Sequence, residues 1–467
     1  MAQNHQQRNG VPGGAREKEI YMSTRGPRLC RLRMALLVLG ALGTAWLHSQ
    51  PVVTLEVGTS PNPVGSGARA LGQGNAFIAV ADDATAASWN PGGLSQLERP
   101  EFSFAVEGLC RRETLSSGVH PEADSSESLR LAAFNYGSVV FPFFAGRNMV
   151  LSLNYLQLYH FDKDLRFPFA FVSGGAGEPD LSMDYSFDQA GTFSVVAPAF
   201  GIDVTDHLSL GITLNIWNDS LTHSSMYERT EVAKGSFVWE DMSSSFHTRE
   251  VNRFEVAEGY SVVLGALYRF NRRWALGAVL KPAFTLDIDH EHVWVSGDQI
   301  TGAGTETRYE KTTDGELDFP WIVGAGVAWR PRDPFTVSTD VTWTQWSRYT
   351  YHDGKRDVNP LTGDAVSRDE LDDTFTWRTG AEYLLIRRNI VVPLRCGFGY
   401  DPGPAVDSVD DFYTINLGAG IQLDRFMFDV GYEFRWGNDV NQATLRGVGA
   451  TQDVRRHRVL ASLIVYF

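Results

Sequence analysis

The sequence predicts an all-β protein: a 14-stranded antiparallel transmembrane β-barrel with an N-terminal hatch that plugs the lumen. Three observations lead to this prediction. Strand-like runs fill the chain from residue 99 onward, the connections between them alternate between short and long, and a segment rich in glycine and alanine precedes them. Short turns at one end and long loops at the other are typical of bacterial outer-membrane barrels.

The composition fits such a barrel better than a bundle of apolar helices. The 467 residues include 45 Gly, 28 Phe, 16 Tyr and 12 Trp, and the formal net charge is −15. The mean hydropathy of −0.19 is what strands with only alternate residues facing lipid would give. The net charge also argues against nucleic acid as a partner.

The negative charge is concentrated in residues 218–253, 286–315 and 348–373, which together hold 20 Asp and Glu against 10 Lys and Arg. We expect each stretch to be a long loop. Acidic loops beside divalent cations and lipopolysaccharide would explain the charge, and ordinary solvated loops would explain it equally well.

Residues 1–49 are predicted to be an N-terminal extension and signal peptide. Basic residues precede an apolar run of about 14 residues, which is too short to span a bilayer comfortably and has the layout of a secretory signal. Cleavage would remove Cys30. Cys110 and Cys396 lie on distant predicted strands, so we expect both to be free thiols.

Residues 50–98 are predicted to form the hatch. The run from Gly65 to Leu94 is rich in small residues, and little of it alternates with a period of two. Small residues let one backbone approach another closely, but they cannot build a core of their own. We therefore expect this segment to pack inside the barrel formed by residues 99–467.

Fourteen strands are predicted at 100–110, 129–141, 148–159, 190–204, 207–217, 254–270, 272–285, 316–330, 334–347, 374–386, 389–400, 412–424, 425–437 and 454–467. The connections after the even-numbered strands are short turns, which places both ends of the barrel and the hatch on the periplasmic side. Alternation is clearest where Phe426 and Phe428 share one strand face and Met427 and Asp429 share the other.

The hatch segment resembles that of the FadL/TodX-type outer-membrane transport proteins. The resemblance rests on Gly67-Ala68-Arg69-Ala70, the pair Gly72 and Gly74, Ala81-Asp82-Asp83-Ala84 and Asn90-Pro91. It continues through Phe319-Pro320-Trp321 and the stretch 340–347, and it covers roughly residues 60–467. The C-terminal Phe467 resembles the terminal aromatic residue that the barrel insertion machinery reads.

The resemblance implies uptake of hydrophobic compounds, either long-chain fatty acids or aromatic hydrocarbons, through the outer membrane of a Gram-negative-type bacterium. It implies no enzymatic activity and no cofactor. It also implies contacts with outer-membrane lipid and lipopolysaccharide. In this family a kink in the third strand opens the wall for lateral release, but residues 148–159 contain no proline to mark one.

An amphiphilic ligand needs an apolar tunnel and one or two cations for a carboxylate. The candidate apolar contacts in the hatch are Phe77, Ile78, Val80, Trp89 and Leu94, and the candidate inward cations are Lys281, Arg378 and Arg395. Arg378 and Arg395 lie on adjacent predicted strands and are expected to converge on one carboxylate. Alternatively, inward arginines pair with inward acids such as Glu382, Asp429 and Glu433.

A second set of residues is expected to hold the hatch to the wall rather than to touch ligand. It comprises Arg69, Asp82, Asp83, Asn90 and Pro91.

Two enzyme-like patterns and one other function stay as alternatives. His207 and Ser209 share a strand face, as in a barrel-wall lipid hydrolase, and Asp287, Asp289 and Glu291 alternate as metal ligands would. We expect neither site. A non-transporting barrel that anchors a secretion or adhesion assembly would show a lumen crossed by salt bridges, whereas a transporter would show a continuous apolar path to the hatch.

Overall fold

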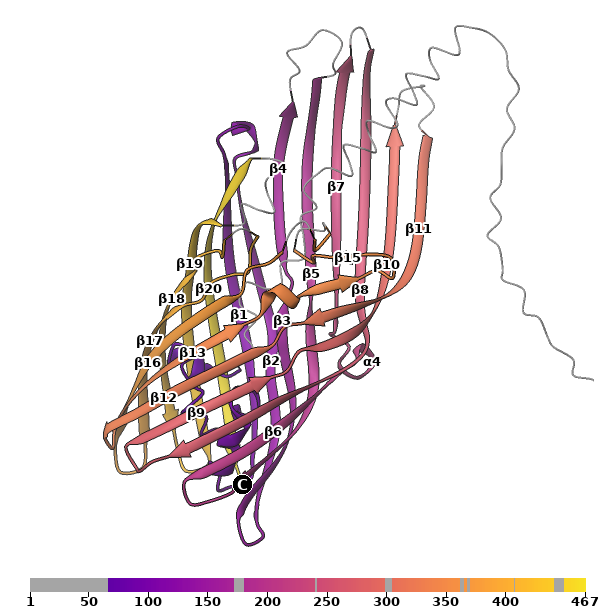
Figure 1. The fold of residues 1–467 in the computed structure, drawn as a ribbon. Helices are drawn as coiled ribbons and strands as arrows, with labels where there is room; N and C mark the ends of the chain where they lie inside the picture. The colour runs from indigo at the N-terminus through magenta and orange to yellow at the C-terminus, as the bar shows by residue number, and fades with distance from the viewer. Residues whose placement is uncertain are drawn as a thin grey trace, which may run out of the picture. The chain divides into compact units, whose positions relative to one another are not determined.

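The computed structural model describes residues 66–467 except 172–179, 240–241, 299–304, 362–364, 368–369, 407 and 441–448. The predicted signal peptide and residues 50–65 of the predicted hatch therefore lie outside the described residues. Fourteen strands pair in order around a ring, and β20 pairs antiparallel with β1 to close it (Figure 1). Each of the fourteen predicted strands corresponds to one wall strand, so the predicted fold is confirmed.

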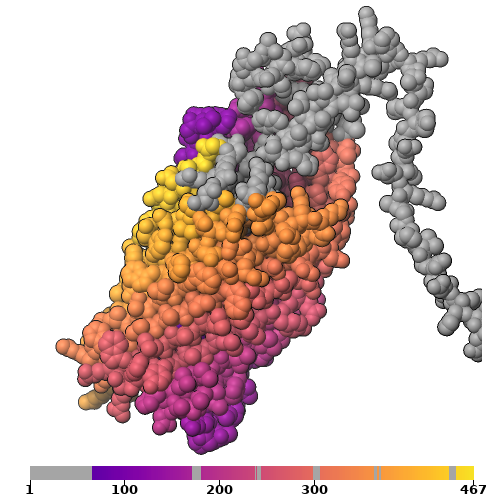
Figure 2. Space-filling model, viewed as in Figure 1, coloured from indigo at the N-terminus to yellow at the C-terminus, as the bar shows by residue number. Residues whose placement is uncertain are grey.

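The wall strands are β1 (Glu101–Ser117), β2 (Ser125–Phe144), β3 (Asn148–His160), β5 (Asp180–Asp203), β6 (Leu208–Trp217), β8 (Met242–Arg269), β9 (Trp274–Lys281), β12 (Ile322–Arg332), β13 (Phe335–Thr344), β16 (Thr374–Ile386), β17 (Val391–Tyr400), β18 (Tyr413–Gln422), β19 (Phe426–Val440) and β20 (Ala450–Tyr466). On the face shown in Figure 2, the described wall strands pack side by side without a visible gap.

The predicted alternation along the wall strands is confirmed. In β19, Phe426 and Phe428 are exposed on the outside, whereas Met427 and Asp429 are buried toward the lumen. Side chains of a strand point alternately to its two faces, so a barrel wall turns its apolar residues to lipid and its polar residues inward. Cys396 is exposed on β17, Cys110 lies on β1, and both are free thiols as predicted.

Two wall strands continue far beyond the barrel. β5 has 24 residues and β8 has 28, and their outlying halves pair with β4 (Lys163–Phe171), β7 (Met226–Trp239) and β10 (Phe284–Asp298). β11 (Thr305–Phe319) pairs with β10 at the edge of this sheet. Figure 1 shows these strands rising together above the barrel. We call β4, β7, β10, β11 and the outlying halves of β5 and β8 the extension sheet.

The extension sheet corrects the prediction that residues 218–253 and 286–315 are loops, because β7, half of β8, β10 and most of β11 occupy them. The acidic residues alternate with apolar ones. Along β10, Asp287 and Asp289 are exposed while Leu286 and Ile288 are buried on the other face. A strand in a half-exposed sheet takes this pattern, so the charge that indicated loops is the solvated face of a sheet.

Two predicted strands contain breaks. The stretch 272–285 is interrupted at Pro282-Ala283 between β9 and β10, and 316–330 is interrupted at Pro320-Trp321 between β11 and β12. Proline cannot donate a ladder hydrogen bond. At the second break the chain stops pairing with β10 and begins to pair with β9 and β13.

β3 has no proline, but its register with β5 shifts between Gln157 and Tyr159. No proline in the sequence indicates this register shift.

The hatch segment, residues 66–97, lies inside the ring as α2 (Ala68–Gly72), α3 (Ala86–Trp89) and the 3-10 helix η1 (Pro91–Gln96). All of its residues are buried except Arg69, Asp82 and Gln96, which are partly buried. Among the described residues no helix is long and apolar enough to cross a membrane.

Glycines in the wall make room for the hatch. On each of nine glycines, an added Cβ atom would lie 2.8 Å or less from a hatch atom: Gly201, Gly211, Gly265, Gly277, Gly324, Gly380, Gly397, Gly418 and Gly431. They form a belt that we call the glycine seat, and several pair directly across strands, such as Gly211 with Gly265 and Gly380 with Gly397. Only glycine permits this close approach of two backbones, so the wall and the hatch fit by shape at this level.

Candidate functional site

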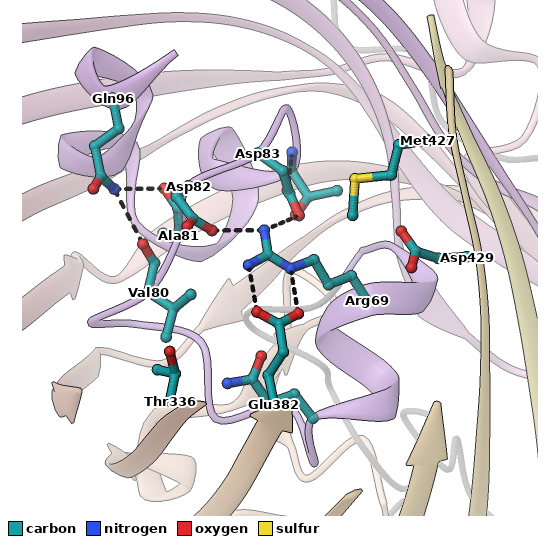
Figure 3. A network of polar contacts seen from close by, with 12 residues as sticks. Arg69, Val80, Ala81, Asp82, Asp83, Gln96, Thr336, Glu382, Met427 and Asp429 are labelled. Atoms are coloured by element: carbon teal, nitrogen blue, oxygen red, sulfur yellow. Dashed lines mark hydrogen bonds and ion pairs between the residues drawn. The ribbon is translucent and has the colours of Figure 1, made fainter. Parts of the chain in front are cut away.

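Arg69 is the centre of the polar contacts between the hatch and the wall (Figure 3). Its guanidinium lies 2.6 Å from Asp82 and 3.6 Å from Asp83 within the hatch, and it forms a two-point contact with Glu382 of β16 at 3.1 and 3.2 Å. Because these side chains are mostly buried, each charged group is stabilised by its ion-pair partners, and removal of one partner would leave a buried charge uncompensated.

Asn90 and Pro91 make the other predicted contacts of the hatch. The Asn90 side-chain amide donates to the carbonyl oxygens of Ile78 in the hatch and Ala266 in β8, at 2.8 and 2.9 Å. Pro91 packs against Gly211 of the glycine seat. These are the contacts that a hatch-holding role requires, and the role itself stays a prediction.

The lumen side of β16–β20 and β1 is lined with ion pairs. Arg395 contacts Glu382 at 2.6 Å and also binds Asp429, while Arg378 lies 3.0 Å from Asp401. Further pairs on this side are Arg456 with Glu433 and Arg458 with Glu107. The structure therefore does not bring Arg378 and Arg395 onto one carboxylate, because Arg378 contacts Asp401, just after β17, whereas Arg395 contacts Glu382 of β16 and Asp429 of β19.

Lys281 has a different environment. It ends β9 with its side chain on the lumen side and is half-buried. Within the described residues its ammonium group makes no ion pair or hydrogen bond. Of the three predicted ligand cations, it alone is not already neutralised by a protein carboxylate.

The predicted apolar contacts of the hatch, Phe77, Ile78, Val80, Trp89 and Leu94, are all buried in one large cluster. Phe77 and Trp89 meet edge to face with ring centroids 5.8 Å apart. The same cluster continues along the opposite side of the lumen from the ion pairs and reaches the extension sheet.

Aromatic rings fill this apolar side between the hatch and the extension sheet. Phe319 lies 4.8 Å from Phe284, 5.2 Å from Tyr159 and 5.4 Å from Tyr349, measured between ring centroids. Trp217 stacks on Phe284 at 5.4 Å. A molecule that passes from the extension sheet to the hatch must displace these side chains.

A cavity of about 300 Å³ lies where the extension sheet meets the strap, residues 350–360, which includes β14 (Thr350–His352) and β15 (Asp357–Val358). Its floor is apolar and aromatic, with Tyr227, Phe254 and Ile288 from the sheet and Tyr351 from the strap. Its rim is basic, with Arg229, Lys311, Lys355 and Arg356 against a single acid, Asp353. Large concave sites with an apolar lining and a few polar groups are the usual form of ligand pockets.

None of the predicted ligand residues lines this cavity. Most of the residues that do were missed because their segments were expected to be loops, whereas Phe254 and Leu317 lie in predicted strands. A signal was present. Leu286, Ile288, His290 and His292 alternate with acidic residues and read as a strand with an apolar and aromatic face.

Charged groups of both signs lie at the cavity: Arg229 pairs with Glu231 at 3.0 Å, Arg356 pairs with Asp353 at 3.1 Å, and His292 contacts Glu250 at 3.1 Å. Burial, with the nearby positive groups His292, Arg229 and Lys311, lowers the pKa of His290 from 6.5 to about 4, so this ring is neutral at pH 7. Burial works against ionisation of Glu250, but hydrogen bonds from His292 and Asn252 and the charge of Arg229 lower its pKa to about 2.

His352 fastens the strap to the extension sheet. Its Nδ1 lies 2.7 Å from Asp357 of β15 and its Nε2 lies 3.2 Å from Asp318 of β11, whose other oxygen accepts from Thr285 of β10. Glu316 of β11 is its cross-strand neighbour. Partial burial lowers the pKa of His352, but its bonds to Asp357 and Asp318 outweigh this and raise the pKa above 6.5.

We expect the strap to loosen as the pH rises. The doubly protonated ring is the form that can donate to both acids, so the fastening is complete below pH 6.5 and is lost as the pH passes through the raised pKa of His352. Amide hydrogen exchange at residues 350–352, corrected for intrinsic rates, should speed up over this range. The His352→Gln variant should show no such transition, and an unchanged transition in that variant would contradict the assignment.

The enzyme-like patterns are not assembled. Ser209 donates to Asp203 at 2.6 Å, but His207 contacts the backbone oxygen of Arg269, so the two are not joined as nucleophile and base. Asp287, Asp289 and Glu291 lie along the outer face of β10. Among the described residues no group of three or more His, Cys, Asp or Glu is placed to hold a metal ion.

A family model described as "Outer membrane protein transport protein (OMPP1/FadL/TodX)" matches residues 190–452, more than half of the chain. Among solved structures, a Pseudomonas aeruginosa FadL homologue matches with a TM-score of 0.56 at 14% identity, over 86% of this chain and 98% of that one. The Pseudomonas putida toluene transporter TodX matches with 0.52 at 13% identity, over 86% and 98%. No curated protein matches the sequence significantly.

Proposed function

The chain belongs to the OMPP1/FadL/TodX family of outer membrane transport proteins, and we propose that it carries hydrophobic small molecules from the cavity under the strap to the hatch. The observation that supports this route is the single apolar cluster that contains both the cavity floor and the hatch residues Phe77, Ile78 and Trp89. A hydrophobic molecule can leave water at one end of that cluster and stay in apolar surroundings to the other.

The proposed orientation puts the extension sheet outside the cell and the short turns, both ends of the barrel and the hatch on the periplasmic side. It rests on the even number of wall strands and on the length of their connections. Outer-membrane lipid would contact the exposed apolar band, to which Phe141, Leu153 and Trp377 contribute. Phe467 is exposed beside Pro100 and is the residue proposed for recognition by the insertion machinery.

Along this route, Lys281 is the cation we propose for the carboxylate of a fatty acid. Its ammonium group is half-buried and has no acid partner within the described residues, so a ligand carboxylate can supply the missing charge-assisted hydrogen bond. Arg378 and Arg395 would have to exchange a protein carboxylate for the ligand, which gives them little net gain.

The route can be tested by filling the cavity. Thr313 of β11 lines it, and Thr312 lies on the opposite, exposed face of the same strand. We expect Thr313→Trp to lower uptake of a hydrophobic tracer, such as hexadecanoate or toluene, by about tenfold or more. The larger side chain would occupy the cavity, and a loss of only about 1.4 kcal/mol of binding free energy lowers the affinity tenfold. Uptake would be measured in cells that lack another transporter of this family.

Thr312→Trp is the matched control and should leave uptake near the wild-type rate. Equal uptake by both variants would remove the cavity from the route. An absence of protein-dependent uptake in the wild type would instead favour the second function, a barrel that anchors an assembly. The ion pairs along β16–β20 are the feature that this second function would use.

A further inference from the structure

Two rows of residues cross the extension sheet, and the cavity lies over most of each: one row has three rings at its centre, and the other has polar and cationic groups. Each row takes one residue from each of β5, β7, β8, β10 and β11, joined by direct cross-strand pairing. The ring row is Gly191, Tyr227, Phe254, His290 and Thr313, and the polar row is Gln189, Arg229, Asn252, His292 and Lys311.

The ring row is a continuous stack. Tyr227 and Phe254 lie 4.7 Å apart with 15° between their planes, and Phe254 and His290 lie 4.2 Å apart with 4° between theirs. The ring of Tyr351 in the strap is at 85° to the ring of Phe254, with the two centroids 5.7 Å apart. Tyr351 therefore bounds the ring row on the side of the strap. These rings contact one another and line the cavity, so a flat ligand ring in the cavity can pack against them.

The polar row supplies positive charge to the same cavity. Lys311 has no ion-pair partner within the described residues, and Lys355 and Arg356 of the strap also line the cavity. Burial is the main cause of the low pKa of His290, and the positive charges of Arg229 and Lys311 add to it. Arg229 pairs with Glu231 and Arg356 with Asp353, whereas Lys311 and Lys355 make no ion pair within the described residues, so these two lysines are the cations open to an anionic ligand.

We propose, on the basis of the transport function proposed above, that the cavity recognises an arylalkanoate: a flat aromatic ring on the ring row and a carboxylate on the polar row. Residues two apart on a strand are about 6.6 Å apart, which matches a ring joined to a carboxylate by a short spacer. The compound 3-phenylpropanoate has a ring and a carboxylate joined by such a spacer.

The two other ligand classes fit the cavity less well. A neutral aromatic hydrocarbon would bury the polar row without giving Lys311 a partner. A long-chain fatty acid has no ring to lie against the ring row.

The orientation of the ligand follows from the strands. Along β8 the residue of the ring row, Phe254, is nearer the barrel than Asn252 of the polar row, and the next residue pair inward is Val256 with Ile288. The ring therefore points toward the aromatic side chains around Phe319, and the carboxylate faces outward.

The test compares three probes on the purified full chain in detergent: 3-phenylpropanoate, propylbenzene and hexadecanoate. We expect 3-phenylpropanoate to bind at least about tenfold more tightly than propylbenzene, since a charge-assisted hydrogen bond is worth about 10- to 100-fold. Lys311→Met should remove most of this preference and leave propylbenzene binding unchanged, and Lys311→Arg should restore it. Lys234→Met, on the exposed face of β7, is the matched control and should change neither.

Equal affinities for 3-phenylpropanoate and propylbenzene, or a preference that survives Lys311→Met, would overturn the arylalkanoate proposal while the transport function stands. Tighter binding of hexadecanoate, abolished by Thr313→Trp, would also overturn it in favour of a fatty acid. If none of the three probes binds, both this proposal and the proposed transport function fail.

Discussion

Removing residues 55–97 is expected to turn a closed barrel into an ion-conducting pore. Residues 66–97 are buried except for the partly buried Arg69, Asp82 and Gln96, and they contact the wall directly at the glycine seat. A ring of fourteen strands is too wide for its own side chains to fill, so the lumen opens when the hatch is absent, and conductance should rise by at least about tenfold. Single-channel recording in planar bilayers measures this directly.

A gentler variant tests the same point without a deletion. A side chain on Gly380 would meet the Gln73 backbone oxygen, since even its Cβ would lie 2.0 Å away, so Gly380→Leu should displace the hatch and raise conductance. Gly108→Leu on β1 is the matched control, because nothing lies within 4 Å of its added Cβ. Conductance that stays at the wild-type level in both the deletion and Gly380→Leu would show that the hatch does not close the lumen.

Arg395→Ala is expected to destabilise the barrel by about 3–5 kcal/mol, which is the usual result of removing one partner from a buried ion pair. The Arg395 side chain is 0% exposed and contacts both Glu382 and Asp429, and Glu382 also holds Arg69 of the hatch. Its loss leaves two buried carboxylates with too little positive charge. The temperature at which heat-modifiable gel migration is lost should fall clearly.

Arg308→Ala is the matched control, because the Arg308–Glu310 pair on β11 is more than half exposed and exposed pairs contribute about 0–1 kcal/mol. The comparison also tests the carboxylate-binding role predicted for Arg395. If Arg395→Ala keeps wild-type stability but loses affinity for a fatty acid, the guanidinium binds ligand and the structural role is wrong.

The sequence predicted the wall well because wall strands carry their own signal. In β19, apolar and inward-facing residues alternate along the chain, as in Met427 followed by Phe428, so residues next to each other indicate which face points to lipid. The extension sheet was missed because its strands combine an apolar face with an acidic one. Asp287 and Asp289 were counted as loop charge although Ile288 between them is buried.

The candidate site was predicted only in part. The parity of β16 and β17 indicated that Arg378 and Arg395 point inward, but it did not indicate which acids they meet. Asp401 and Asp429 reach them from other parts of the chain. Lys281 points inward and has no acid partner in the described part of the chain, and this too is a property of the folded lumen.

By itself, the sequence determined the all-β class, the fourteen wall strands, the inward and outward faces and the presence of a small-residue hatch segment, because each of these depends on residues close together in the chain. Only the tertiary structure decided which charges are paired, where the glycine seat touches the hatch and how the cavity forms. Phe254 meets Tyr227 and His290 through cross-strand register, which joins residues 27 and 36 positions away. Register is fixed by the packing of the whole sheet, so no local pattern encodes it.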